Sequence, residues 1–319
     1  MRRTPSRVLI LIAFALSVAI AGVPAGCGGG RESGGGVTLG EATTTVTSST
    51  QATSPGSAAT SLTTAPASTR TTSSGPATTL PPSGPVSVYF AFREKVLPAH
   101  RSAADPTEPA KAAMEALLRG PTAGERSGGL STSIPAGTKL LGLTISGSRA
   151  TVDLSSEFQS GGGSQSMAMR VAQVVFTLTQ FPQVRSVAFH LQGTPVTALG
   201  GEGVMLDQPV GRRDFAALTP AILVESPAWG DAVRNAVHVW GTANVFEGVF
   251  TVQLTDWDGA IVAEQRVQAS SGTGTRGAFD VTLPFVADRS GRGSLIVFSK
   301  SAKDGSQENL TEIPLRVEK

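Results

Sequence analysis

The sequence has a single cysteine, Cys27, and only three histidines. One cysteine excludes an intramolecular disulfide framework and any metal site built from several thiolates. Three scattered histidines leave little material for a zinc or haem centre. The sequence therefore predicts no metal and no other cofactor.

Charged residues are also scarce, at 16% of the chain, and the formal net charge is +2. This slight basicity comes from Arg2, Arg3 and Arg7, because without them 23 basic residues (26 − 3) face 24 acidic ones. Nucleic-acid-binding domains carry clustered positive charge, so no nucleic-acid partner is expected. Long apolar runs are missing beyond the N-terminus, which excludes a polytopic membrane protein.

The sequence lacks the Gly-x-Ser-x-Gly, His-Glu-x-x-His and Walker motifs of common enzymes. Residues 272–277 match the spacing of a dinucleotide fingerprint, but a strand pattern follows where that motif needs a helix N-terminus. We interpret this segment as a loop between strands. Residues 256–259 (Asp-Trp-Asp-Gly) begin like a calcium loop but lack its twelfth-position glutamate, which favours a hairpin turn. We therefore predict that the protein is not an enzyme.

An export signal occupies residues 1–27. A basic start is followed by an apolar stretch of about 16 residues at 8–23, which is short for a membrane span. The segment Val-Pro-Ala-Gly-Cys at 23–27 resembles the lipobox of bacterial lipoproteins, in which cleavage frees the cysteine for acylation with fatty acids such as palmitate. The resemblance implies that Cys27 is lipidated and anchors an extracytoplasmic protein to the outer face of the cytoplasmic membrane. An uncleaved membrane anchor is the alternative.

Residues 28–85 are dominated by Gly, Ser, Thr and Pro, which fill 41 of these 58 positions. Such a segment buries too little apolar surface to offset its ordering entropy. We predict a disordered stalk with a mean reach of about 40 Å by random-coil statistics. Two globular domains are expected to follow, at 86–205 and 220–319, with a linker at 206–219.

Residues 86–205 have the pattern of an α+β domain of order β-α-β-β-α-β, in which one sheet packs with two helices. The first helix is expected to begin with Thr107 as its N-cap. A hairpin is expected at about 141–154. The second helix follows it, with Ser164 or Ser166 as its cap.

Four short motifs mark this stretch: Ala-Leu-Leu-Arg-Gly-Pro at 116–121, Ile-Pro-Ala-Gly-Thr at 134–138, Val-Asp-Leu-Ser-Ser-Glu-Phe at 152–158 and Phe-Pro-Gln-Val at 181–184. In this order they resemble the GerMN domain of spore-germination and sporulation proteins. The resemblance implies an envelope-associated, non-enzymatic domain whose fold is related to ring-building domains that oligomerise.

Residues 220–319 contain seven expected strands with turns about every 8–12 residues, which predicts an all-β immunoglobulin-like sandwich. No cysteine pair joins the two sheets, so hydrophobic burial must hold them, with Trp240 as an expected core residue. The expected strands lie at 221–225, 237–242, 248–256, 261–269, 278–283, 294–299 and 310–317.

A second resemblance rests on Ser226-Pro227, the run 239–248, Asp-Trp-Asp-Gly at 256–259 and Asp-Gly-Ser at 304–306. These motifs occur in the order and spacing of the immunoglobulin-like domain of bacterial spore germination, which commonly follows a GerMN domain. The tandem implies a role linked to sporulation or germination.

Together these features predict a non-enzymatic, lipid-anchored envelope protein that acts as an interaction or assembly module and binds an envelope protein or self-associates. The alternative is a lipoprotein that binds peptidoglycan or another wall glycan. That hypothesis requires an exposed aromatic platform, for which Trp229 and Trp257 are the candidates. Glu247 is a further candidate for contact with a partner, although strand-turn hydrogen bonding is the simpler interpretation.

Overall fold

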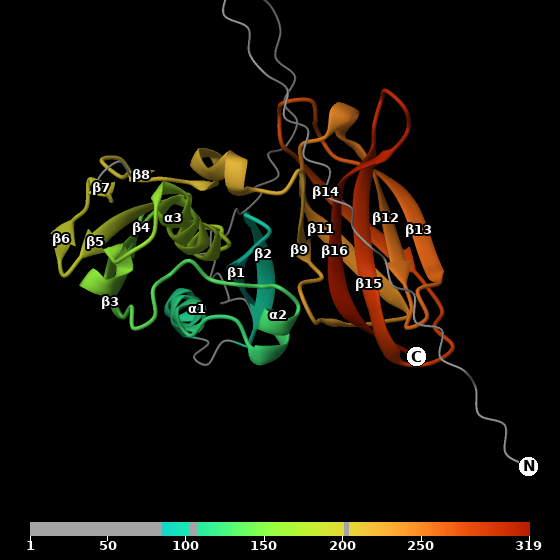
Figure 1. Cartoon of the computed structure of the whole chain (residues 1–319), viewed down its shortest axis with the longest axis horizontal. Coiled ribbons are helices and arrows are strands. Elements are labelled where there is room, and N and C mark those ends of the chain that lie inside the picture. Colours follow the sequence, from blue (N-terminus) through green and yellow to red (C-terminus); the bar gives the residue numbers. More distant parts are fainter. Residues whose placement is uncertain (1–84, 103–106, 201–203) are drawn as a thin grey trace, which may run out of the picture. The chain divides into compact units, whose positions relative to one another are not determined.

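The computed structural model describes residues 85–102, 107–200 and 204–319 (Figure 1). The predicted signal segment with its cysteine, residues 1–27, lies outside these ranges, as does the predicted stalk up to residue 84. The described chain forms an α+β part first and a β-rich part second.

The α+β part begins with a hairpin of β1 (Val86–Phe92) and β2 (Lys95–Arg101). The two strands are joined by a two-residue turn at Arg93 and Glu94, whose φ angles are 47° and 64°. Two positive φ angles give a turn that matches the twist of paired strands. β2 was not expected, because Pro98 lies within it and because Arg-Glu is not a common turn pair.

A separate four-stranded sheet contains, in spatial order, β3 (Leu140–Ser146), β4 (Arg149–Leu154), β5 (Ser186–Leu191) and β6 (Thr194–Pro195). The prediction of a single sheet for this part was wrong. Because β1 pairs with the missed strand β2, it does not join the other sheet. A short pair, β7 (Ala198–Leu199) and β8 (Val204–Met205), follows.

The described helices of this part are α1 (Pro109–Leu118), α2 (Ala123–Ser127) and α3 (Ser164–Leu178). α3 connects the parallel strands β4 and β5 and contacts both β5 and β1, so it lies between the two sheets (Figure 1). The apolar stripe predicted for α3 is buried in a core shared with β1, α1 and β5.

Both predicted helix caps were wrong by one residue or more. α1 has Glu108 as its N-cap rather than Thr107, since Pro109 takes the first helical position, where its fixed φ fits. α3 has the extended residue Gly163 as its N-cap, and Ser164 is already helical.

The β-rich part contains all seven expected strands and one that was not expected, the short strand β10. Hydrogen bonds connect them in the order β13, β12, β15, β16, β10, β11 and β14, with β9 paired to β11. Their bounds are β9 (Ile222–Ser226), β10 (Ala232–Arg234), β11 (Ala236–Ala243), β12 (Val249–Thr255), β13 (Ile261–Gln268), β14 (Gly277–Pro284), β15 (Gly291–Lys300) and β16 (Gln307–Glu318). Short 3-10 turns are η1 (Ser156–Gln159), η2 (Arg212–Leu218) and η3 (Phe246–Gly248).

The path of strands folds over to enclose one core. Phe250 of β12 and Phe279 of β14 belong to strands far apart in the path, yet their ring centroids are only 4.8 Å apart in an edge-to-face contact. β9 pairs with β11 on one side of the core, while β10 runs parallel to β16 on the other. This strand switch between two layers is typical of an immunoglobulin-like sandwich.

Trp240 does not belong to the core, so that expectation was wrong. Along β11, Val237, Val239 and Gly241 are buried, whereas His238 and Trp240 alternate with them and face outward. Gly241 is required in the inner row, because a Cβ atom there would lie 2.1 Å from the carbonyl oxygen of Leu223 on β9. The close approach of the β9 backbone therefore fixes which face of β11 is buried.

We expect Gly241→Ala to lower the free energy of unfolding by about 2 kcal/mol or more, since β9 must move to admit the methyl group. Gly142→Ala on β3 is the matched control, because its Cβ would meet its nearest neighbour, the Asp153 Cβ, at an ordinary 3.6 Å. Urea unfolding of both variants checks this prediction. Equal stability of the two variants would contradict the close approach of β9.

Candidate interaction sites

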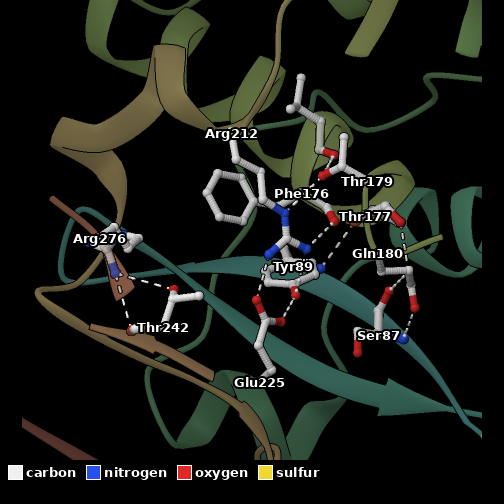
Figure 2. A network of polar contacts seen from close by, with 11 residues as sticks. Ser87, Tyr89, Phe176, Thr177, Thr179, Gln180, Arg212, Glu225, Thr242 and Arg276 are labelled. Carbon is white, nitrogen blue, oxygen red and sulfur yellow. Dashed lines mark hydrogen bonds and ion pairs between the residues drawn. The ribbon is translucent and has the colours of Figure 1, made fainter. Parts of the chain in front are cut away.

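A buried cluster of polar side chains lies where the α+β part meets the β-rich part (Figure 2). Its members are Tyr89 from β1, Arg212 from η2 and Glu225 from β9. Tyr89 is fully buried and Glu225 is 4% exposed. Since water does not solvate these groups, the protein itself must supply their hydrogen bonds.

The Glu225 carboxylate accepts one hydrogen bond on each oxygen. The Tyr89 hydroxyl donates to Oε2, and Nη1 of Arg212 donates to Oε1. Nη2 of Arg212 also donates to the Tyr89 hydroxyl over 3.1 Å, which closes a ring of three side chains (Figure 2). The two charged groups therefore contact each other directly, and a neutral phenol contacts both.

Arg212 is held from the other side by α3 and the residue after it. Its Nε donates to the Thr179 hydroxyl over 2.8 Å, and Nη2 donates to the carbonyl of Phe176 over 3.2 Å. Its guanidinium lies 4.8 Å from the Phe176 ring centroid, within the range of cation–π contact. The guanidinium is thus fixed in both position and orientation.

Burial and the charge pair shift the pKa values of Tyr89 and Arg212. Burial raises the pKa of Tyr89 well above its usual value, so the phenol stays protonated and keeps donating to Glu225. Burial by itself would lower the pKa of Arg212, but its interactions with Tyr89 and Glu225 outweigh burial and raise that pKa. Arg212 therefore remains a cation at any pH at which the fold persists.

Side chains of α3 and its C-terminal turn hydrogen-bond the backbone of β1 along the edge that does not pair with β2. Gln180 accepts from the backbone N–H of Ser87 over 2.7 Å and donates to its carbonyl over 2.6 Å. Thr177 accepts from the N–H of Tyr89, and Gln173 donates to the Tyr89 carbonyl. These bonds satisfy the strand edge and set the position of Tyr89 in the cluster.

A second arginine secures the segment that leads into β9. Arg276 donates to the carbonyl of Pro220 over 2.7 Å. It also donates to the carbonyl of Thr242 over 3.2 Å (Figure 2). Burial lowers the pKa of Arg276, and the charge of Glu225 acts in the opposite direction. The entry to β9 is thereby fixed next to Glu225.

Two matches to protein-family models accompany this geometry. Residues 87–197 match the model Germane, described as sporulation and spore germination. Residues 221–306 match the model Gmad2, described as an immunoglobulin-like domain of bacterial spore germination. The chain carries a Germane domain followed by a Gmad2 domain. Both resemblances seen in the sequence motifs are confirmed, and the two domains associate the chain with sporulation and germination.

Solved structures similar to the chain include GerMN domains. The first GerMN domain of the sporulation protein GerM from Bacillus subtilis is 23% identical, with 41% of this chain and 98% of that one covered and a TM-score of 0.36. The tandem GerMN domains of the same protein are 16% identical over 63% and 61% of the two chains, with a TM-score of 0.36. A Clostridium perfringens protein described as a lipoprotein is 24% identical over 41% and 90%, with a TM-score of 0.31. No curated protein gave a significant match.

The buried cluster connects the two family domains. Tyr89 belongs to the Germane domain, Glu225 belongs to the Gmad2 domain, and Arg212 comes from the segment between them. A further bond, between Nδ1 of His100 and the Asp231 carboxylate at 2.7 Å, joins the same two domains. This cluster could not be predicted from the sequence, because its residues are up to 136 positions apart and no local motif marks them.

The two tryptophans proposed as a glycan platform are both engaged within the protein. Trp229 of the Gmad2 domain is half-buried and packs on Phe92 of the Germane domain, with ring centroids 5.3 Å apart. Trp257 is 44% exposed, but the Arg289 guanidinium lies 3.1 Å from its ring centroid. One face of the Trp257 ring is therefore covered by a cation.

Glu247 lies in the η3 turn with a positive φ of 54°. Its backbone N–H donates to the Thr273 hydroxyl over 2.9 Å, and its carbonyl accepts from Gln268. The main chain of Glu247 thus makes the turn hydrogen bonds that the sequence suggested. Contact of its exposed side chain with a partner stays a prediction.

The two motifs that resembled ligand loops are turns in the Gmad2 domain. Residues 272–277 connect β13 to β14, and a strand follows them as predicted. In the other loop, one oxygen of Asp256 accepts from the N–H groups of Asp258 and Ala260, which confirms the hairpin turn. In the described part of the chain, no group of three or more His, Cys, Asp or Glu side chains is arranged to hold a metal. No helix there is long and apolar enough to cross a membrane.

We expect Glu225→Gln to lower the free energy of unfolding by about 1–3 kcal/mol, because Arg212, whose side chain is 29% exposed, is left without its anionic partner. The matched control is Glu108→Gln, which removes a carboxylate from an exposed pair with Lys111, where about 1 kcal/mol or less is expected. Denaturant unfolding of the two variants measures the difference. Similar losses in both would show that the cluster contributes no more than a surface ion pair.

Proposed function

We propose that the chain is a non-enzymatic, lipid-anchored envelope protein whose Germane and Gmad2 domains act together as an interaction module for a protein partner. The observation that carries this proposal is the buried cluster of Tyr89, Arg212 and Glu225. These side chains come from the two domains and the segment between them, and their hydrogen bonds to one another connect the domains. Such an arrangement presents surfaces of both domains in a fixed relation, and this favours binding of a large partner.

The same cluster supports a structural role over a catalytic one. All three nitrogens of the Arg212 guanidinium donate to protein acceptors, and the phenol of Tyr89 is held protonated. Groups committed in this way position neighbouring elements and are not free to bind or transfer a proton.

Exposed groups of the Gmad2 domain support the partner-binding part of the proposal. Phe246, next to Glu247 in the η3 turn, is 58% exposed. Exposed aromatic side chains are surfaces that proteins commonly use to bind one another.

Lipid anchoring rests on the sequence alone. Cys27 follows an apolar stretch of signal-peptide length and the small residues of a lipobox. In this proposal the acylated cysteine holds the protein at the outer face of the cytoplasmic membrane, and the Ser/Thr-rich segment separates the anchor from the Germane domain.

We expect the wild-type chain to incorporate labelled palmitate in cells and to fractionate with membranes, while Cys27→Ala does neither. Ser33→Ala, a substitution a few residues beyond the cysteine, is the matched control and should behave as wild type. The measurement is metabolic labelling followed by membrane fractionation. Unchanged fractionation of Cys27→Ala, with no label in the wild type, would refute the lipid anchor.

We expect a photo-crosslinking amino acid placed at Phe246 to capture one defined envelope protein, or a second copy of the chain, in living cells. Capture should fall in a Glu225→Gln background, because loosened domains no longer present one fixed surface, and should persist with Glu108→Gln. Mass spectrometry of the crosslinked species identifies the partner. Absence of any specific crosslinked species, or equal capture in both backgrounds, would count against a module that depends on rigid domains.

A further inference from the structure

Trp240, which the alternation of β11 turns away from the core, is 41% exposed. It lies between two neighbouring strands, since it pairs with Asp280 on β14 and with Ser226 on β9. Unlike Trp229 and Trp257, its indole makes no ring or cation contact within the described chain. An indole in this position offers an aromatic face to a ligand.

The indole borders a cavity of about 880 Å³. The lining combines Trp240 and Asp280 of the Gmad2 domain with Phe181 and Pro182 of the Germane domain, and the paired Arg212 and Glu225 also contribute. This volume lies within the range of about 300–1,000 Å³ that is typical of small-molecule sites. Apolar surface with a few convergent polar groups is the usual composition of such sites.

Three polar groups in the lining retain bonding capacity. Among the described residues, Asp280 bonds through Oδ1 alone, to His238, and His100 bonds through Nδ1 alone, to Asp231. The Ser226 hydroxyl makes no hydrogen bond within the described residues. These groups include donors and acceptors, as the hydroxyl groups of a saccharide require.

The charges of the lining disfavour an anionic ligand. Among the described residues that border the cavity, Arg212 is the permanent cation, and it is already bonded to Glu225. The Asp280 carboxylate adds a negative charge at the rim. A phosphate-rich or uronic acid polymer would therefore find no unpaired arginine or lysine among the described lining residues, whereas a neutral ligand needs no such cation.

We propose that this groove binds a neutral saccharide, with the indole of Trp240 stacked on the apolar face of one sugar ring and Asp280, His100 and Ser226 bonding its hydroxyl groups. The site is distinct from the surface at Phe246, and it adds a ligand of its own to the proposed interaction with a protein partner.

The test uses the full-length chain in detergent and a panel of immobilised glycans that contains neutral hexose and N-acetylhexosamine oligomers beside uronic acid oligomers. We expect retention on neutral members, with a loss of about tenfold or more in affinity for Trp240→Ala. Trp240→Phe keeps an aromatic ring on which a sugar can stack and should retain part of the affinity. Trp257→Ala removes the other strongly exposed indole and should behave as wild type.

Thermal unfolding of Trp240→Ala checks that the variant is folded, as expected for an exposed side chain. No retention on the panel, retention only on the uronic acid oligomers, or loss with Trp257→Ala in place of Trp240→Ala would overturn the proposal. Each of these outcomes leaves the crosslinking result at Phe246 unaffected, so failure of the saccharide site and failure of the partner-binding module are distinguishable.

Discussion

The Glu225 carboxylate lies out of water between a phenol and a guanidinium, and the arrangement of the two domains depends on that contact. A buried carboxylate is costly unless it is paired, and Arg212, whose side chain is 29% exposed, supplies the opposite charge. A small displacement of the Germane and Gmad2 domains would break these bonds without letting water replace them, whereas full separation would let water solvate both charged groups. While the domains stay in contact, the cluster therefore favours one relative placement, and the groove beside Trp240 exists only in that placement, since both domains line it.

The position of Glu225's partner is in turn set by α3. The side chains of Gln173, Thr177 and Gln180 bond the backbone of β1 as a neighbouring strand would, so β1 cannot shift in register along the helix. This fixes the position of the Tyr89 hydroxyl so that it contacts the Glu225 carboxylate. The helix thus contributes to domain orientation without touching the Gmad2 carboxylate itself.

Local patterns in the sequence predicted most elements because their causes are local. The seven expected strands of the Gmad2 domain and the buried stripe of α3 follow from alternation and from helical spacing. The strand β2 was missed because Pro98 interrupts its pattern, and with it the division of the Germane domain into two sheets. The bond between Tyr89 and Glu225 spans 136 positions, and no spacing rule can indicate a contact of that range.

Trp240 shows how a correct strand can be assigned to the wrong face. Side chains alternate between the two faces of the strand, with two valines and Gly241 on one face and His238 and Trp240 on the other. Size alone favours burying tryptophan, but the backbone of β9 passes so close to β11 that only a residue without a side chain fits the inner row at Gly241. The face that carries the valines is buried for that reason, and Trp240 lies on the surface. Once the cluster has fixed both domains, this indole faces a groove whose walls need no further ordering, and a rigid groove loses less entropy when a ligand binds.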